Sequence, residues 1–221
     1  MSINYSNFLT QVRDYTEVDS NVLTDSIIQG FIRNVEIDVA NKVDYDDLRK
    51  YSTSTFTANN KYLSLPADCI IVRSLFVAES GTLASGTVSY LDKRDQTFIR
   101  EYNGSNAIGV PKYWGNWDEL TVLVAPTPGQ AYPVQLEYIC EPPQFTSTNS
   151  TYLSTYNENL LLYGTLTEAF SYLKGPMDIY NLYKGKYDIE VQNFALQQMG
   201  RRRRAEYDDG VPRIKIESPS P

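Results

Sequence analysis

Histidine is absent from this chain of 221 residues, and cysteine occurs only twice. Histidine is the commonest general base near neutral pH and the commonest metal ligand in proteins. The sequence also lacks the glycine-rich loops that bind phosphate, GxxxxGKS/T and GxGxxG, and the GxSxG turn that presents a catalytic serine. We therefore expect no catalysis, no bound cofactor and no metal ion.

Long apolar runs are also absent. No segment approaches the roughly 20 apolar residues that a membrane-spanning helix needs. The N-terminal segment MSINYSNFLTQVRDY has neither the basic start nor the apolar core of a signal peptide. We expect a protein that is made in a cytoplasm and does not enter a membrane. Cys69 and Cys140 lie in apolar, strand-like runs, which predicts two buried, reduced thiols rather than a disulfide.

Basic residues are too few for a general DNA-binding protein. The chain has 20 lysines and arginines against 27 acidic residues, and its net charge is -7. Because neutralised phosphates supply most of the affinity for DNA, an acidic surface repels DNA instead of holding it. Asp44, Asp46 and Asp47 form a cluster, but it lacks the glycine and the closing glutamate of a calcium loop. We predict a solvated helix end or loop there.

The N-terminal part of the sequence is predicted to be helical. Residues 4–15 have the pattern of a short amphipathic helix, and residues 19–43 that of a longer one. Three residues are candidate N-caps of the longer helix: Asp19, Ser20 and Thr24. Its apolar side chains recur every four residues and predict one wide buried stripe: Leu23, Ile27, Phe31, Val35, Val39 and Val43, with Ile28 and Ile32 beside them.

The middle of the chain, from about residue 53 to residue 145, has short β-rich runs separated by proline and glycine. Strands are expected within residues 61–66, 68–80, 85–92, 111–126 and 131–140. The fourth of these segments should contain two strands joined by a turn at residues 116–118. A helix of about three turns is expected within residues 93–103. This pattern predicts a small antiparallel sandwich or barrel.

The sequence from about residue 151 to residue 200 is again typical of helices. The first helix is expected to end at Gly175, with Pro176 opening the next one. Its predicted buried face consists of Leu162, Leu166, Ala169, Phe170 and Leu173. The next helix should end at Gly200 and carries a stripe that we interpret as packing: Tyr180, Tyr183, Tyr187, Val191 and Phe194.

These expectations give an α+β protein with three parts. Residues 1–50 and 151–200 form a helical bundle, residues 51–150 form an inserted antiparallel β-sandwich or barrel-like domain, and residues 201–221 form an extended tail. The tail has few aliphatic side chains, so it cannot offset an ordering entropy of about 1–2 kcal/mol per residue. We expect it to be disordered in the free protein and to become ordered on a partner.

Two groups of tail residues are predicted to dock on a partner protein. Val211, Ile214 and Ile216 belong to a short alternating segment that can add as a strand to a sheet edge. The other group is a run of arginines: Arg201, Arg202, Arg203 and Arg204. The run has three interpretations, namely a solvated helix end that complements the helix dipole, a salt-bridge patch for an acidic protein, and a contact with DNA.

Four segments, in this order, resemble the head-to-tail adaptor proteins of tailed bacteriophages, which are also called gateway or neck proteins. They are DSIIQGFIRNVEIDVANKV, YLSLPADCIIVRSLFV, GVPKYWGNWDELTVLVAPTPGQAYPVQLEYICEPPQF and NLLLYGTLTEAFSYLKGP. The resemblance covers roughly residues 5–199. The arginine run and the residues after it have no counterpart in it.

The resemblance implies a non-catalytic structural protein in the neck of the virion. Proteins of this kind form a ring, usually a dodecamer, that joins the portal protein to a tail nozzle or tail tube protein. The ring lines the channel through which genomic DNA passes during ejection, without sequence-specific binding and without a membrane.

Two alternatives remain open. One is another virion neck or tail component, such as a nozzle or tail-completion protein. The other is a non-catalytic module that binds carbohydrate or nucleic acid, in which Trp114 and Trp117 form a stacking platform near a turn. Exposure of both indole rings would favour this module.

Overall fold

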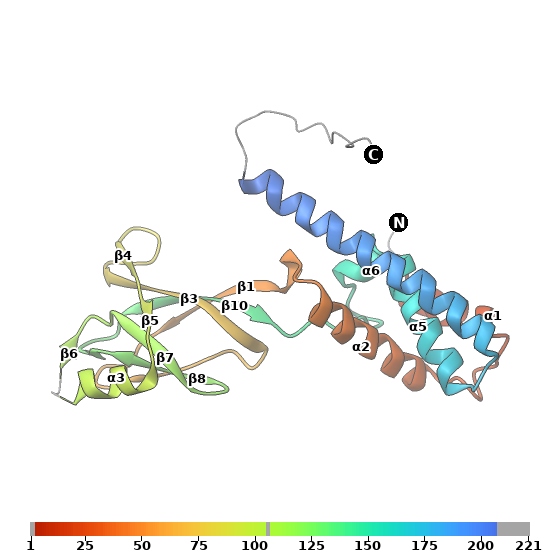
Figure 1. Cartoon of the computed structure of the whole chain (residues 1–221). Helices are drawn as coiled ribbons and strands as arrows, with labels where there is room; N and C mark the ends of the chain where they lie inside the picture. Colours follow the sequence, from red (N-terminus) through yellow and green to blue (C-terminus); the bar gives the residue numbers. More distant parts are fainter. Residues whose placement is uncertain (1–2, 105–106, 207–221) are drawn as a thin grey trace. The chain divides into compact units, whose positions relative to one another are not determined.

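The fold is α+β, as predicted, and the computed structural model describes residues 3–104 and 107–206. The chain divides into two compact units (Figure 1). The helical unit combines the described residues up to Asp46 with those from Pro143 onwards, and the β unit spans Asp47–Pro142. Among the described residues, no helix combines the length and the apolar character that a bilayer span requires.

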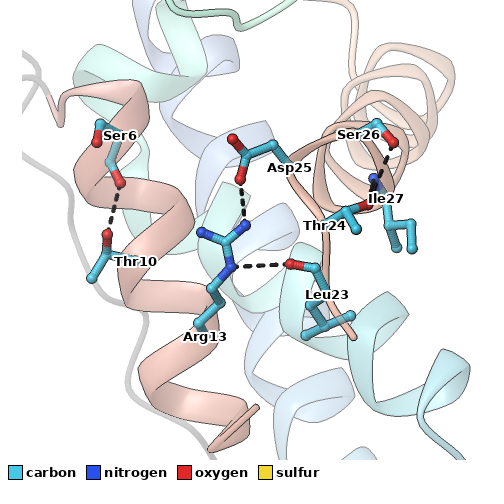
Figure 2. A network of polar contacts seen from close by, with 8 residues as sticks. All are labelled: Ser6, Thr10, Arg13, Leu23, Thr24, Asp25, Ser26 and Ile27. Carbon is cyan, nitrogen blue, oxygen red and sulfur yellow. Dashed lines mark hydrogen bonds and ion pairs between the residues drawn. The ribbon is translucent and has the colours of Figure 1, made fainter. Parts of the chain in front are cut away.

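The helical unit is built from α1 and α2 before the β unit, and from α4, α5 and α6 after it. Their bounds are α1 Tyr5–Thr16, α2 Asp25–Lys42, α4 Tyr152–Tyr156, α5 Glu158–Tyr172 and α6 Met177–Glu206. Of the three candidate N-caps of α2, Thr24 takes the role, because its side chain accepts the N–H of Ile27. Arg13 of α1 donates to the carbonyl of Leu23 at 3.0 Å and pairs with Asp25, which ties α1 to the start of α2 (Figure 2).

The buried face of α2 differs from the predicted stripe. Ile28, Ile32, Val35 and Val39 are buried within the helix, whereas Ile27 and Phe31 are only partly covered. The reason is the contact with α5, where a Cβ on Gly164 would lie 2.6 Å from Cγ1 of Val35. This close approach brings the Val35 side of α2 to the centre of the interface.

The turn between α5 and α6 uses Lys174, not Gly175, as its left-handed residue. Lys174 has a φ of 53°, and its N–H donates to the carbonyl of Ser171 at 3.2 Å. The N–H of Gly175 donates to the carbonyl of Phe170 at 2.9 Å, which completes a Schellman motif. Glycine is still required at 175, because a Cβ there would lie 2.9 Å from the Phe170 ring. The expectation that Gly175 itself is the cap is therefore wrong by one residue.

The aromatic stripe of α6 packs against the other helices, as predicted. Tyr187 and Phe194 are buried, and the Tyr183 ring stacks on Phe170 with centroids 5.3 Å apart. The expected end at Gly200 is wrong, because α6 continues to Glu206. Arginine, alanine and glutamate favour helix, which offsets the cost of about 1 kcal/mol for one interior glycine. The first residues of the predicted extended tail, including the arginine run, are therefore helical.

The β unit contains two four-stranded sheets. The first has the order β1-β10-β3-β4, with β1 Arg49–Thr55, β10 Pro133–Cys140, β3 Cys69–Ser80 and β4 Thr87–Tyr90. The second has the order β2-β8-β7-β5, with β2 Tyr62–Ser64, β8 Thr121–Ala125, β7 Tyr113–Asp118 and β5 Asp92–Lys93. The smaller elements are the strand pair β6 Ile108–Gly109 and β9 Thr127–Pro128, helix α3 Gln96–Asn103 and a short 3-10 helix, Asp46–Leu48.

The two large sheets share one apolar core, as expected for a sandwich. Leu75 and Val134 of the first sheet join Trp114 and Val124 of the second in a single buried cluster. The pairing is mainly antiparallel, but the short pairs β5–β7 and β6–β9 are parallel. The turn between β7 and β8 lies at residues 119–120, later than predicted, because a register shift lets β7 pair as far as Asp118.

Candidate partner-binding surfaces

The predicted docking residues lie at or beyond the end of the part of the chain that the structure describes. Arg201–Arg204 lie on the last turns of α6, and only their backbone is described. Val211, Ile214 and Ile216 lie outside the described residues. Surfaces that could receive a partner must therefore be found on the helices and sheets themselves.

An apolar stripe runs along the outward side of α6. Leu182, Ile189 and Leu196 recur at every seventh residue and are 53%, 58% and 66% exposed. Ile189 lies two residues after the buried Tyr187, and Leu196 lies two residues after the buried Phe194, so each is on the opposite side of the helix from the buried ring. Leu182 lies two turns before Ile189 and shares its side. Met199 extends the same surface. Helix faces in contact with water normally carry charged residues, so this stripe has the character of an interface.

A glycine of α6, Gly185, lies on the same side of the helix as the apolar stripe. A Cβ added to Gly185, between Leu182 and Ile189, would meet no atom within 4 Å. Glycine in a helix interior costs about 1 kcal/mol relative to alanine, and nothing in this unit requires it at position 185. A close approach by another chain would require a small residue there.

The outward side of α2 has a similar character. Gly30, Asn34, Ile37 and Asn41 are exposed, and none of them is charged. Gly30, like Gly185, has open space where a side chain would be. Ile37 is 40% exposed. The helical unit therefore has two outward faces, on α2 and on α6, with exposed aliphatic side chains and interior glycine.

Asp38 of α2 holds α6 in place. The Tyr187 hydroxyl donates to Oδ2 of Asp38 at 2.6 Å, and Nζ of Lys42 lies 2.6 Å from the same oxygen. Partial burial opposes ionisation, but the two hydrogen bonds prevail and lower the pKa of Asp38. This contact fixes the rotation of α6 and hence the direction of its apolar stripe.

Phe145 anchors the chain where it re-enters the helical unit. The ring is 1% exposed and makes edge-to-face contacts with Tyr5 and Phe8, at centroid distances of 5.3 and 5.8 Å. Its backbone N–H donates to Oε1 of Glu36 at 2.8 Å. One residue thus joins α1, α2 and the segment that leads to α4.

Glu36 is a buried carboxyl group in the middle of α2. Burial raises its pKa to about 7, while the Phe145 N–H and the nearby Arg33 partly oppose the shift. The Arg33 guanidinium lies 3.6 Å from Oε2 of Glu36. The carboxyl group therefore titrates near neutral pH in the folded chain, well above its usual 4.5.

Glu36→Gln should make the stability of the helical unit less dependent on pH. Between pH 4.5 and 7 the folded chain keeps the Glu36 proton that the unfolded chain releases, so stability falls as the pH rises through this window. In the wild-type chain, the free energy of unfolding should fall by on the order of 3 kcal/mol across this window. Glutamine still accepts the Phe145 N–H, so the variant should match wild type at low pH and exceed it at pH 8.

Urea unfolding between pH 4.5 and 8 measures this difference. Asp14→Asn is the matched control, because it removes an exposed carboxyl group from the same unit and should keep the wild-type pH profile. Parallel profiles for Glu36→Gln and wild type would show that Glu36 does not titrate in this range.

The proposed tryptophan platform is not formed. Trp114 is 0% exposed and belongs to the β core, although Trp117 is partly exposed beneath the Arg100 guanidinium, 4.6 Å from its ring centroid. Tyr62 contacts Trp117 edge to face at 5.3 Å. The sequence pattern missed this because it predicted a turn at residues 116–118. Both residues lie on the continuous strand β7, where side chains three residues apart point to opposite faces. The two indole rings are therefore not both exposed, which is the observation that would have favoured a binding module.

In the part of the chain that the structure describes, no group of three or more acidic or cysteine side chains is arranged so that it could hold a metal ion. The segment with Asp44, Asp46 and Asp47 is held by Tyr45, which is 2% exposed and packs 5.4 Å from the Phe194 ring. Cys69 and Cys140 are both free and buried, as predicted.

An acidic hollow lies at the end of α1. It has a volume of about 540 Å³ and opens to solvent. Its lining includes three carboxyl groups against one guanidinium: Asp14, Glu17 and Asp19, with Arg13. Its acidic character makes it a candidate surface for a basic segment.

Comparison with protein families adds an independent result. Residues 3–213 match the family model described as SU10 adaptor protein. The match spans the helices on both sides of the β unit as well as the β unit itself. No curated protein matches the chain.

Proposed function

Because the chain belongs to the SU10 adaptor protein family, a family of structural phage proteins, we propose that it is a subunit of a head-to-tail adaptor ring. The ring joins the portal protein to a tail nozzle or tail tube protein in the neck of the virion. By analogy with such adaptors, it is a dodecamer whose channel passes the genome during ejection. The chain supplies structure and no catalysis.

The observation that carries this proposal is the apolar stripe of α6. Leu182, Ile189 and Leu196 are each more than half exposed and lie in one line. Fully burying one such side chain contributes about 1.5–3 kcal/mol, so three of them supply a useful part of a subunit contact. A lone subunit leaves this surface in water.

The counterpart in the ring is the outward face of α2 on the next subunit. A contact between two different faces of the same chain is heterologous, and such contacts close into rings when the rotation allows it. Gly30 of α2 and Gly185 of α6 would let the two helices approach closely. The uncharged Asn34 and Asn41 would accept an apolar neighbour without burying a charge.

Charge supports two further parts of the proposal. The acidic hollow with Asp14, Glu17 and Asp19 could receive an arginine run such as Arg201–Arg204 from a second subunit. The net charge of -7 suits a channel through which DNA passes without adhering.

Co-sedimentation with purified portal rings tests the function. The full chain should bind portal rings in a fixed cyclic stoichiometry, and the mass of the complex should give the number of subunits. Binding to tail tube or nozzle protein in the absence of any portal binding would favour the alternative of a nozzle or tail-completion protein.

Ending the chain at Glu206 should weaken portal binding without unfolding the helices. The removed residues include Val211, Ile214 and Ile216, each of which could contribute about 1.5–3 kcal/mol if it became fully buried on a partner. Added strand hydrogen bonds would contribute about 0.5–1.5 kcal/mol each. We expect portal affinity to fall at least about 100-fold, which corresponds to roughly 2.7 kcal/mol.

Melting temperature and portal co-sedimentation of the truncated and full chains give the two readouts. Replacing Arg201–Arg204 by serine in the full chain separates charge from anchoring, because its effect should be largest at low salt. Unchanged portal affinity after truncation would exclude a docking role for residues 207–221.

A further inference from the structure

The two cysteines of the chain, which are distant in the sequence, lie directly opposite each other in the β unit. Cys69 begins β3, Cys140 ends β10, and the two are Cα partners in the antiparallel pairing, just beyond a register shift between Ile139 and Cys140. Both side chains belong to the same buried core cluster, with 6% and 0% of their surface exposed. The pair therefore points to one side of the sheet.

The hydrogen bonds show which kind of pair this is. The N–H of Glu141 donates to the carbonyl of Asp68 at 2.7 Å, one residue outside the pair on each strand. The N–H of Cys69 donates to the carbonyl of Pro66 at 3.0 Å, before β3 begins. Cys69 and Cys140 thus occupy a non-hydrogen-bonded position, where opposing Cα atoms are about 4.5 Å apart and side chains lie closest. Disulfides span Cα distances of about 4.4–6.8 Å.

We propose that Cys69 and Cys140 form an intramolecular disulfide once the protein leaves a reducing compartment, so that the pair is a redox modification site. The thiols stay reduced where thioredoxin and glutathione are active. Release of a virion into aerated medium supplies the oxidant, dioxygen. The two thiols lose two protons and two electrons, one S–S bond forms, and dioxygen becomes hydrogen peroxide.

The same bond can form by exchange with oxidised glutathione. A Cys69 thiolate attacks one glutathione sulfur and displaces the other glutathione as a thiolate, which takes up a proton. The Cys140 thiolate then attacks the Cys69 sulfur and displaces the second glutathione. Burial slows the first attack by keeping the thiols protonated, whereas the neighbouring Lys50 ammonium favours the thiolate of Cys140.

Lys50 and Tyr138 organise the polar edge of this pair. Nζ of Lys50 lies 3.1 Å from Oδ2 of Asp68, and the Tyr138 hydroxyl donates to Oδ1 of Asp68 at 3.1 Å. These bonds connect β1, the start of β3 and β10 beside the two sulfur atoms. The disulfide would add a covalent bond where β10 leaves the sheet for Pro142 and the helical unit.

The test uses the isolated full chain, so it is independent of the proposed function; only release with the virion rests on that function. The protein is unfolded in reductant, refolded in buffers of increasing oxidised to reduced glutathione ratio, quenched in acid, and alkylated in denaturant. We expect reactive thiols to fall from two to none and the intact mass to fall by two hydrogen atoms. The melting temperature should rise by about 5–15 °C.

Cys69→Ala and Cys140→Ala each retain one thiol and serve as controls that should show no melting shift with the glutathione ratio. The wild-type protein carries the test even if a variant does not fold. Two alkylated thiols in the refolded protein at the most oxidising ratio would overturn the proposal. Single glutathione adducts or disulfide-linked dimers in place of the internal bond would do the same.

Discussion

Replacing Phe145 by alanine is expected to destabilise the helical unit by about 3–5 kcal/mol, as for other large-to-small changes of buried aromatic residues. The ring is 1% exposed and fills the space between Tyr5 and Phe8, so the variant leaves a cavity between α1 and the segment before α4. The Phe145 N–H can still reach Glu36, since the change removes only the side chain. The expected loss therefore comes from packing.

Urea unfolding of the full chain measures this loss, with Tyr156→Ala as the matched control. Tyr156 follows Phe145 in the same unit but is 69% exposed, so its replacement should cost less than about 1 kcal/mol. Equal free energies of unfolding for wild type and Phe145→Ala would show that Phe145 is not an anchor of the helical unit.

Replacing Ile189 by lysine is expected to prevent ring assembly while the subunit stays folded. Ile189 is 58% exposed in the subunit, so a lysine is easily solvated there. In the proposed ring the lysine would displace an apolar contact worth about 1.5–3 kcal/mol and bring a charge to an uncharged face of α2. Each subunit contact should weaken at least about 10-fold, or about 1.4 kcal/mol, and the effect repeats around the ring.

Gln197→Lys is the matched control for this experiment. Gln197 is exposed on α6 next to Leu196, and it lies about 80–100° around the helix from Ile189 and Leu196, so it flanks their line and is not part of it. Circular dichroism should show folded subunits for both variants, and mass measurement with portal rings should show complete rings only for Gln197→Lys. If the Ile189→Lys variant formed complete rings, the α6 stripe would not be part of the subunit contact.

The sequence predicted most of the helices, because their apolar residues follow the helical period closely. It misjudged details that depend on a partner element. The centre of the α2 face moved towards Val35 because Gly164 of α5 lies against it, and no pattern within α2 contains that information. Lys174 adopts the left-handed conformation at the end of α5, and Gly175 is needed for a different reason, because the Phe170 ring occupies the space beside it.

The β unit was predicted less completely. Strand β1, with the sequence RKYSTST, is polar and lies at the edge of its sheet, so it lacks the apolar alternation of a half-buried strand. The short parallel pairs depend on contacts between distant segments. Trp114 and Trp117 were predicted on either side of a turn, but they lie on one continuous strand whose alternating side chains place only Trp114 in the main core.

The candidate surfaces could be predicted only in part. The interval of seven between Leu182, Ile189 and Leu196 is visible in the sequence, but the tyrosines of the same helix show an equally regular pattern. Which stripe is buried depends on contacts such as that of Tyr187 with Asp38, far apart in the sequence. The bond between Glu36 and Phe145 likewise joins two segments with no sequence signal between them.

Electron cryomicroscopy of the neck of the virion that carries this chain tests the central claim most directly. A closed ring of copies of the chain on the portal, with α6 of each copy against α2 of the next, is the predicted result. The claim would be contradicted if the chain occurred as a single copy per vertex, or at a site that does not touch the portal.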